Sequence, residues 1–181
     1  KLPRSGWEGC REPLRVRCDE AQTILGGIGK NVSHDPWMGD PLIRRRDGAF
    51  SYHLASVVDD AAVSVTRVVR GRDLATSTPI QNVLQNLLDL PRPVYRHHFL
   101  LLERHGTKMA KLHGSLSWSQ LRDSLHPEQL TGQLAGLLGL EECSSAVSPA
   151  DLLESFSWEA IGQVDVVVSW LPPRLSFEPV Q

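Results

Sequence analysis

Residues 41–102 alternate between short apolar segments and helical patterns, and this alternation most constrains the fold. "PLIRRRDGAFSYHL" predicts a strand, an Asp-Gly turn and a second extended segment. "LASVVDDAAVS" has the composition of a short helix, and "VTRVVRG" is typical of a β-branched strand. "STPIQNVLQNLLDLP" predicts a helix, and "VYRHHFLLLE" a buried strand. This order predicts an α/β fold whose parallel sheet is joined by crossover helices.

The strongest of these helix predictions rests on three local signals. Ser77 is the expected N-cap, Pro79 suits the first turn, and Pro91 ends the pattern. One apolar face carries the core-facing side chains, which we expect to be Ile80, Val83, Leu84, Leu87 and Leu88.

The rest of the chain has a different character. A short strand is expected over "LRVRC". After residue 115, "SWSQLRDSL", "PEQLTGQLAGLLGL" and "SPADLLESF" predict three helices, the last capped by Ser148 and Asp151. The tail is expected to form one strand followed by irregular chain. We therefore divide the chain into an irregular segment (1–40), an α/β segment (41–115) and a helical segment with its tail (116–181).

Composition limits the classes of function. The formal net charge is −2, so a nucleic-acid partner would have to meet a local basic patch. Cys10, Cys18 and Cys143 are few, odd in number and widely spaced, which favours a reducing, cytosol-like compartment over a disulfide scaffold. No apolar run approaches the length of a membrane span, and "KLPRSGWEGC" lacks the apolar stretch of a signal peptide.

Two lysines stand out in "GTKMAKLHGS". The chain has nineteen basic residues, and only four of them are lysines, yet Lys108 and Lys111 lie three apart in this glycine-flanked segment. A compact ammonium on a flexible stem can follow the charge that moves through a phosphate group during its reaction. The alternative is a solvated surface loop. The glycines near Lys30 resemble a phosphate loop but lack its full spacing.

Polar residues also gather around the predicted strand "VTRVVRG". Arg70 and Asp73 lie at its end, where ligands bind in open α/β sheets, and arginine can hold a carboxylate with two hydrogen bonds. The alternative is a surface ion pair. Asp59 and Asp60 are either paired acids or metal ligands, or a cap beside an exposed charge.

Aromatic and histidine side chains near these strands have ordinary structural explanations. Tyr52 at a strand end is compatible with core packing through a hydrogen-bonded hydroxyl. His97 and His98 alternate along a strand, so one is expected to face inward and one outward.

Taken together, "DGAFSYHLASVVDD", "VTRVVRGRD", "STPIQ" and "KMAK" resemble one known family in their order and spacing. They are similar to the second half of the catalytic domain of class I glutamyl-tRNA synthetases, above all to the shortened glutamyl-Q tRNA(Asp) synthetases. The resemblance is close over about residues 41–115 and looser over 116–160. It implies the C-terminal half of a Rossmann-like sheet, followed by a small helical region that contacts the tRNA stem.

The resemblance also implies roles for individual residues. Tyr52, Ser56 and Arg70 match glutamate-binding positions, with Arg70 holding a carboxylate. "KMAK" resembles the signature loop K-M-S-K-S, which implies that Lys108 and Lys111 stabilise the ATP phosphates during catalysis.

Two further positions would complete the ATP site. The Met109 backbone would face adenine, and Asp73 would lie near the ATP, which is bound with Mg²⁺. "WEGCR" resembles the last part of a zinc-binding insert, so Cys10 is a candidate zinc ligand whose partners are missing from this sequence.

The sequence departs from the family in several places. The second class I signature, H-I-G-H, is absent, and in the family it belongs to an N-terminal half that lies upstream of the position of Lys1. We expect that half or a partner subunit to cover the sheet edge. Ala110 replaces the loop serine, Leu112 replaces a basic residue, and Arg72 replaces a neutral or acidic one.

These features lead to two hypotheses about function. In the first, the complete protein is an ATP-dependent ligase that activates glutamate and transfers it to the queuosine of tRNA(Asp), while this chain alone is not competent. In the second, the chain is a non-catalytic synthetase remnant that acts as an RNA-binding or structural subunit. In either case we expect a cytoplasmic or organellar-matrix protein without a membrane partner.

Overall fold

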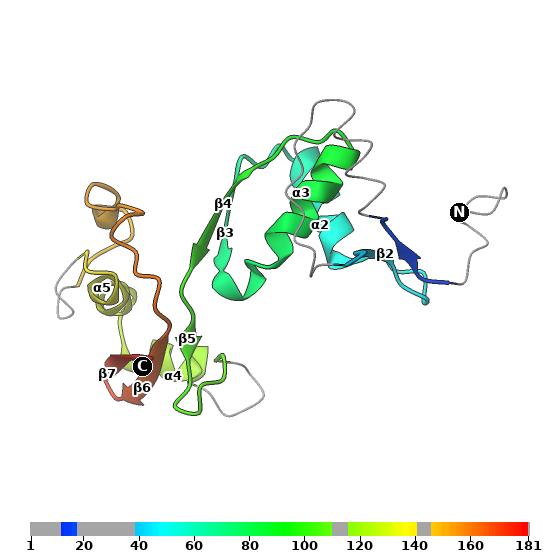
Figure 1. Ribbon diagram of the computed structural model, residues 1–181. Helices are drawn as coiled ribbons and strands as arrows, with labels where there is room; N and C mark the ends of the chain where they lie inside the picture. The colour runs from blue at the N-terminus through cyan, green and yellow to red at the C-terminus, as the bar shows by residue number, and fades with distance from the viewer. Residues whose placement is uncertain (1–11, 18–38, 110–115, 141–145, 181) are drawn as a thin grey trace. The chain divides into compact units, whose positions relative to one another are not determined.

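The computed structural model describes residues 12–17, 39–109, 116–140 and 146–180, which form two compact units, Lys1–His97 and His98–Gln181. Cys10, Cys18, Lys30, Lys111 and Cys143 lie outside the described residues. The elements in chain order are β1 (Leu14–Arg15), β2 (Leu42–Arg44), α2 (Tyr52–Ala62), β3 (Arg67–Gly71), η2 (Arg72–Leu74), α3 (Ser77–Leu87), β4 (Val94–His98), β5 (Leu101–Leu102), α4 (Trp118–Ser124), α5 (Pro127–Leu137), η4 (Asp151–Leu153), β6 (Val166–Leu171) and β7 (Arg174–Pro179) (Figure 1).

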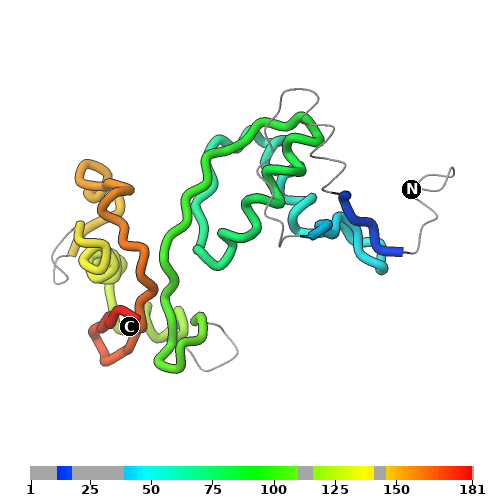
Figure 2. The backbone as a smooth tube through the Cα atoms, viewed as in Figure 1, coloured from blue at the N-terminus to red at the C-terminus, as the bar shows by residue number. Residues whose placement is uncertain are grey.

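The first unit contains the predicted order of strands and helices. β3 and β4 run side by side (Figure 2), and the helices between them are η2 and α3. The Val94 N–H donates to the Thr66 carbonyl at the start of both strands, and Arg70 contacts His97 near their ends, so the strands are parallel. The predicted crossover is therefore confirmed here. β2 instead pairs antiparallel with β1.

The turn after β2 brings the chain to the start of α2. Gly48 has φ +88°, a conformation that favours glycine, and Asp47 Oδ1 accepts from the Ala49 N–H at 3.1 Å. Ser51 then caps α2 by accepting from the Leu54 N–H at 3.3 Å. The helix therefore begins at Tyr52, and the prediction that Tyr52 ends a strand is wrong.

Helices α2 and α3 pack against each other (Figure 1). Val57, Val83 and Leu84 are almost completely buried in this unit. The buried face of α3 differs from the predicted one, because Gln81 and Gln85 are also buried while Leu88 is 46% exposed. The predicted N-cap is displaced by one residue, since Ser77 is the first residue of α3 and Thr76 precedes it.

The packing of α2 gives a direct test of this core. Val57 is 1% exposed and the adjacent Val58 is 45% exposed. We expect Val57→Ala to lower the free energy of unfolding by about 2 kcal/mol, because it removes two buried methyl groups and leaves a cavity. Val58→Ala, the matched control, should change it by less than about 0.5 kcal/mol. Urea denaturation followed by circular dichroism measures both; equal effects would contradict the orientation of α2.

The second unit contains a three-stranded sheet in the order β5-β6-β7. β5 is parallel to β6, and β6 is antiparallel to β7. The predicted single strand "VYRHHFLLLE" is therefore wrong: it is divided into β4 and β5 at Phe99 and Leu100, and the two parts belong to different sheets. Leu100 is fixed by Asp165, whose Oδ1 accepts from the Leu100 N–H at 2.8 Å. The tail, predicted as one strand and irregular chain, is the β6–β7 hairpin.

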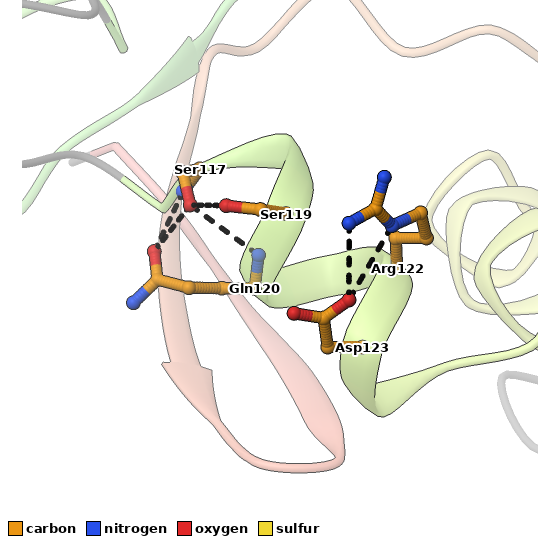
Figure 3. Close-up of polar contacts among 5 residues, drawn as sticks. All are labelled: Ser117, Ser119, Gln120, Arg122 and Asp123. Carbon is orange, nitrogen blue, oxygen red and sulfur yellow. Dashed lines mark hydrogen bonds and ion pairs between the residues drawn. The ribbon is translucent and has the colours of Figure 1, made fainter.

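Two of the three predicted helices in this unit are confirmed. α4 begins with a capping box, in which Ser117 Oγ accepts from the Gln120 N–H at 3.3 Å and Gln120 Oε1 accepts from the Ser117 N–H at 2.8 Å (Figure 3). α5 packs on β7, where Gln133 Oε1 accepts from the Leu175 N–H. "SPADLLESF" forms only the short turn η4, although Ser148 and Asp151 make the predicted cap.

None of the helices in the described part of the chain is long and apolar enough to cross a membrane.

Candidate functional site

Arg70, near the end of β3, is held by two neutral side chains. Its Nε donates to His97 Nε2 at 3.2 Å, and its Nη2 donates to Thr78 Oγ1 at 2.8 Å. Thr78 Oγ1 also lies 3.2 Å from His97 Nε2, so the three side chains form a closed cluster. Thr78 comes from α3 and His97 from β4. The prediction that one of His97 and His98 faces inward and the other outward is confirmed, since His97 is half-buried and His98 is exposed.

An aromatic ring supports the guanidinium group of Arg70. The Cζ atom lies 4.9 Å from the ring centroid of Tyr95, which is the distance of a cation–π contact. The Tyr95 ring is stacked on His97, with centroids 6.5 Å apart and planes 6° from parallel. Gln85 Nε2 donates to the Tyr95 hydroxyl at 2.9 Å. Burial raises the pKa of Tyr95, although the Gln85 hydrogen bond and the Arg70 charge oppose this shift.

Ser56 is tied into the contact between α2 and α3. Its Oγ accepts from Gln81 Nε2 at 2.7 Å and donates to the His53 carbonyl at 3.2 Å. The Ser56 hydroxyl proton is therefore donated to a carbonyl of the same helix. A ligand could bind Ser56 Oγ only by donating a hydrogen bond to its remaining lone pair. The predicted glutamate contact of Ser56 stays a prediction with this restriction.

His53 lies in the first turn of α2, and burial followed by the charge of Arg70 lowers its pKa from 6.5. Its Nδ1 is buried with no hydrogen-bond partner among the described residues. The folded state thus disfavours the protonated imidazole, which gives the cluster around Arg70 a neutral neighbour near pH 7.

This shift predicts a dependence of stability on pH. Because the pKa of His53 is lower in the folded than in the unfolded protein, the unfolded state binds the proton more readily below about pH 6.5. We expect stability to fall as the pH drops from 7 to 5, and to fall less in His53→Asn. Urea denaturation across this range measures the difference, with His98→Asn as the exposed control. Parallel curves for the wild type and His53→Asn would contradict the shift.

The other predicted residues of this unit are more exposed. Tyr52 is 53% exposed and makes an edge contact with the His53 ring, with centroids 5.6 Å apart. Asp73 is exposed within η2, directly after β3. Asp59 is exposed and Asp60 is half-buried. Within the described ranges, no group of three or more His, Cys, Asp or Glu residues could hold a metal ion.

Lys108 and Met109 belong to the second unit and lie on a short hairpin that follows β5. The Glu103 N–H donates to the Thr107 carbonyl at 2.8 Å, and Gly106 in the turn has φ +76°. Lys108 forms an antiparallel bridge with Leu102, and its side chain is exposed. The backbone at Lys108 is therefore fixed by pairing, and the residue as a whole is exposed. Lys111 and Cys10 were also predicted, and both lie outside the described residues.

Sequence reasoning did not assign Thr78, Gln81, Gln85, Tyr95 and His97 to the site. One signal was available for two of them, since Gln81 and Gln85 are four residues apart and therefore share one face of the helix. Tyr95 and His97 share one face of β4 because side chains alternate along a strand. The cluster as a whole offers one oriented cation surrounded by neutral groups. Such an arrangement suits a carboxylate ligand.

Comparisons with known proteins show what the chain is similar to. The model of the family "tRNA synthetases class I (E and Q), catalytic domain" matches residues 5–164. The glutamyl-Q tRNA(Asp) synthetase of Nitratidesulfovibrio vulgaris is 48% identical over 137 residues, which are 74% of this chain and 42% of that protein. The corresponding synthetase of Neisseria meningitidis serogroup B is 40% identical over 156 residues, 83% of this chain and 51% of that protein.

A solved structure shows the same fold. The glutamate tRNA ligase from Elizabethkingia meningosepticum, in complex with its amino acid, superposes with a TM-score of 0.58 and 20% identity over 71% of this chain and 30% of that one. The predicted α/β class is therefore confirmed. The chain spans about half or less of the length of the curated relatives described above.

Proposed function

Because the chain belongs to the catalytic-domain family of class I (E and Q) tRNA synthetases, we propose that its protein activates glutamate with ATP and transfers it to tRNA. The relatives at 40% and 48% identity are named for tRNA(Asp), which supports the queuosine of tRNA(Asp) as the acceptor. A cytoplasmic or matrix location follows from this proposal.

The single observation that carries the proposal is the cluster around Arg70. A carboxylate substrate needs a cation in a fixed orientation, and Arg70 is oriented by Thr78, His97 and the Tyr95 ring. Two titratable neighbours of Arg70 are neutral near pH 7, because His53 has a lowered pKa and Tyr95 a raised one. An incoming carboxylate would thus be the natural counter-ion of Arg70.

The remaining residues take the following roles in the proposal. Tyr52 and Ser56 line the amino-acid site, while Asp73 and the Met109 backbone contact ATP. A substrate carboxylate oxygen attacks the α-phosphorus of ATP, and pyrophosphate leaves. Lys108 and Lys111 stabilise the negative charge on the phosphates as this bond breaks. The glutamyl group then passes to a tRNA hydroxyl, with AMP as the leaving group, so that positioning and charge neutralisation supply the catalysis.

Metal ions have a limited place in this scheme. Mg²⁺ would enter with the ATP phosphates, because it prefers oxygen ligands and is commonly bound through substrate phosphates. Zinc at Cys10 remains a proposal from the sequence, and no step depends on it.

The test is ATP–pyrophosphate exchange in the native full-length protein. We expect exchange that saturates with glutamate and is absent with glutamine at the same concentration, because glutamine lacks the second carboxylate. Aspartate, which is one methylene shorter, controls for general acidity. No stimulation by glutamate would contradict the proposal and favour the RNA-binding or structural role.

A further inference from the structure

The guanidinium group of Arg70 has two edges that can bind a carboxylate with two parallel hydrogen bonds. One edge carries the Nε hydrogen and a hydrogen of Nη2, and the other carries hydrogens of Nη1 and Nη2. In the structure, His97 Nε2 accepts from Nε and Thr78 Oγ1 accepts from Nη2. The first edge is therefore already occupied by two side chains of the protein.

His97 must be an acceptor for this arrangement to exist. The Nε of arginine always donates, so His97 Nε2 carries no proton and the imidazole is neutral, with its proton on Nδ1. Thr78 Oγ1 lies 3.2 Å from the same nitrogen. These two uncharged acceptors stand where the two oxygens of a carboxylate would otherwise bind, and neither of them carries a negative charge.

The face of the guanidinium group is restricted as well. The Tyr95 ring lies 4.9 Å from Cζ, and the same ring stacks on His97. The imidazole plane is thereby fixed relative to β4, and the guanidinium group rests on the ring beside it. Among the described residues, both hydrogens of Nη1 and the second hydrogen of Nη2 have no recorded partner.

From this geometry we infer that His97 and Thr78 are positioning residues that block the Nε edge of Arg70 and present its Nη1–Nη2 edge to the substrate carboxylate. The inference deepens the proposed function and rests on it. It assigns the orientation of the carboxylate relative to Arg70, and it makes the affinity for glutamate depend on two residues that do not touch glutamate.

Two pairs of variants of the full-length protein test this inference through the kinetics of exchange. His97→Leu removes the acceptor, whereas His97→Gln keeps a neutral acceptor at a similar reach. Thr78→Val removes the hydroxyl at equal size, whereas Thr78→Ser keeps it. We expect the KM for glutamate to rise about tenfold in His97→Leu and Thr78→Val, as for the loss of one hydrogen bond. The kcat and the KM for ATP should change less than about twofold, and the Gln and Ser variants should stay near wild type.

A double-mutant comparison separates positioning from a general loss of structure. If His97 acts through Arg70, then His97→Leu should have no further effect on the KM for glutamate in the Arg70→Ala background. A wild-type KM in both His97→Leu and Thr78→Val overturns the inference while leaving the proposed function intact. A KM for glutamate in His97→Gln and Thr78→Ser that is as high as in His97→Leu and Thr78→Val also overturns the inference. Absence of glutamate-dependent exchange in the wild type overturns the proposed function, and the inference with it.

Discussion

Arg70→Ala should raise the KM for glutamate at least about 30-fold, because truncating one member of a desolvated charge pair costs about 2–5 kcal/mol. The guanidinium group is the oriented cation of the cluster, because its Nε donates to His97 and its Nη2 donates to Thr78. Arg70→Lys should not restore binding, since an ammonium lacks the planar pair of donors. Steady-state exchange kinetics against glutamate concentration measure both variants.

The control for Arg70 lies on the same strand. Arg67 begins β3 and is exposed, on the alternate face from Arg70. Arg67→Ala removes the same charge from the same strand and should leave the KM for glutamate within about twofold. Equal increases in the two variants would show that net charge, and not the oriented group, controls binding. An unchanged KM in Arg70→Ala would remove Arg70 from the substrate site.

Lys108→Ala should lower kcat for exchange by about 100–1000-fold, the usual effect of removing one group that stabilises transition-state charge. The KM for glutamate should change little, because the substrate carboxylate binds elsewhere in the proposal. Lys111→Ala should abolish exchange in the same way. Initial rates at saturating ATP and glutamate give kcat for each variant.

The control for the lysines is a cation of the same hairpin. Arg104 is exposed, and its Nε donates to Ser169 Oγ at 3.1 Å. Arg104→Ala should keep kcat near wild type, since we assign it no contact with ATP. Near wild-type exchange in both Lys108→Ala and Lys111→Ala would show that this segment is a solvated loop, the alternative that its spacing leaves open.

Local sequence patterns predicted the helices and strands that are determined by interactions between residues close in the sequence. The helix α2 and the strand β3 follow from their composition, and α3 follows from its periodicity and its prolines. The division of β4 from β5 did not follow, because the apolar run there has no period. Its division depends on Asp165, 65 residues away, which binds the Leu100 N–H. The β6–β7 hairpin was also not predicted. Pro172 and Pro173 lie between its two strands, at a turn where no backbone N–H is required as a hydrogen-bond donor.

The candidate site shows the same limit. Arg70 could be chosen from its place at a strand end. Its hydrogen-bond partners are Thr78 and His97, which are 8 and 27 residues away in the sequence. Their contact with Arg70 depends on the alignment of β3 with β4. An apolar pattern does not predict the burial of Gln81. The Gln81 side chain is buried because its amide donates to the hydroxyl of Ser56 on the neighbouring helix. Polar contacts between elements are set by tertiary packing.

The most direct measurement follows labelled glutamate into tRNA. The native full-length protein is incubated with ATP, radiolabelled glutamate and tRNA(Asp) that either carries or lacks queuosine, and with tRNA(Glu) in parallel. We predict label only on the tRNA(Asp) that carries queuosine, with label lost in Arg70→Ala at the same glutamate concentration. Label on tRNA(Glu) instead would contradict the proposed acceptor, and no label on any tRNA would contradict glutamate transfer itself.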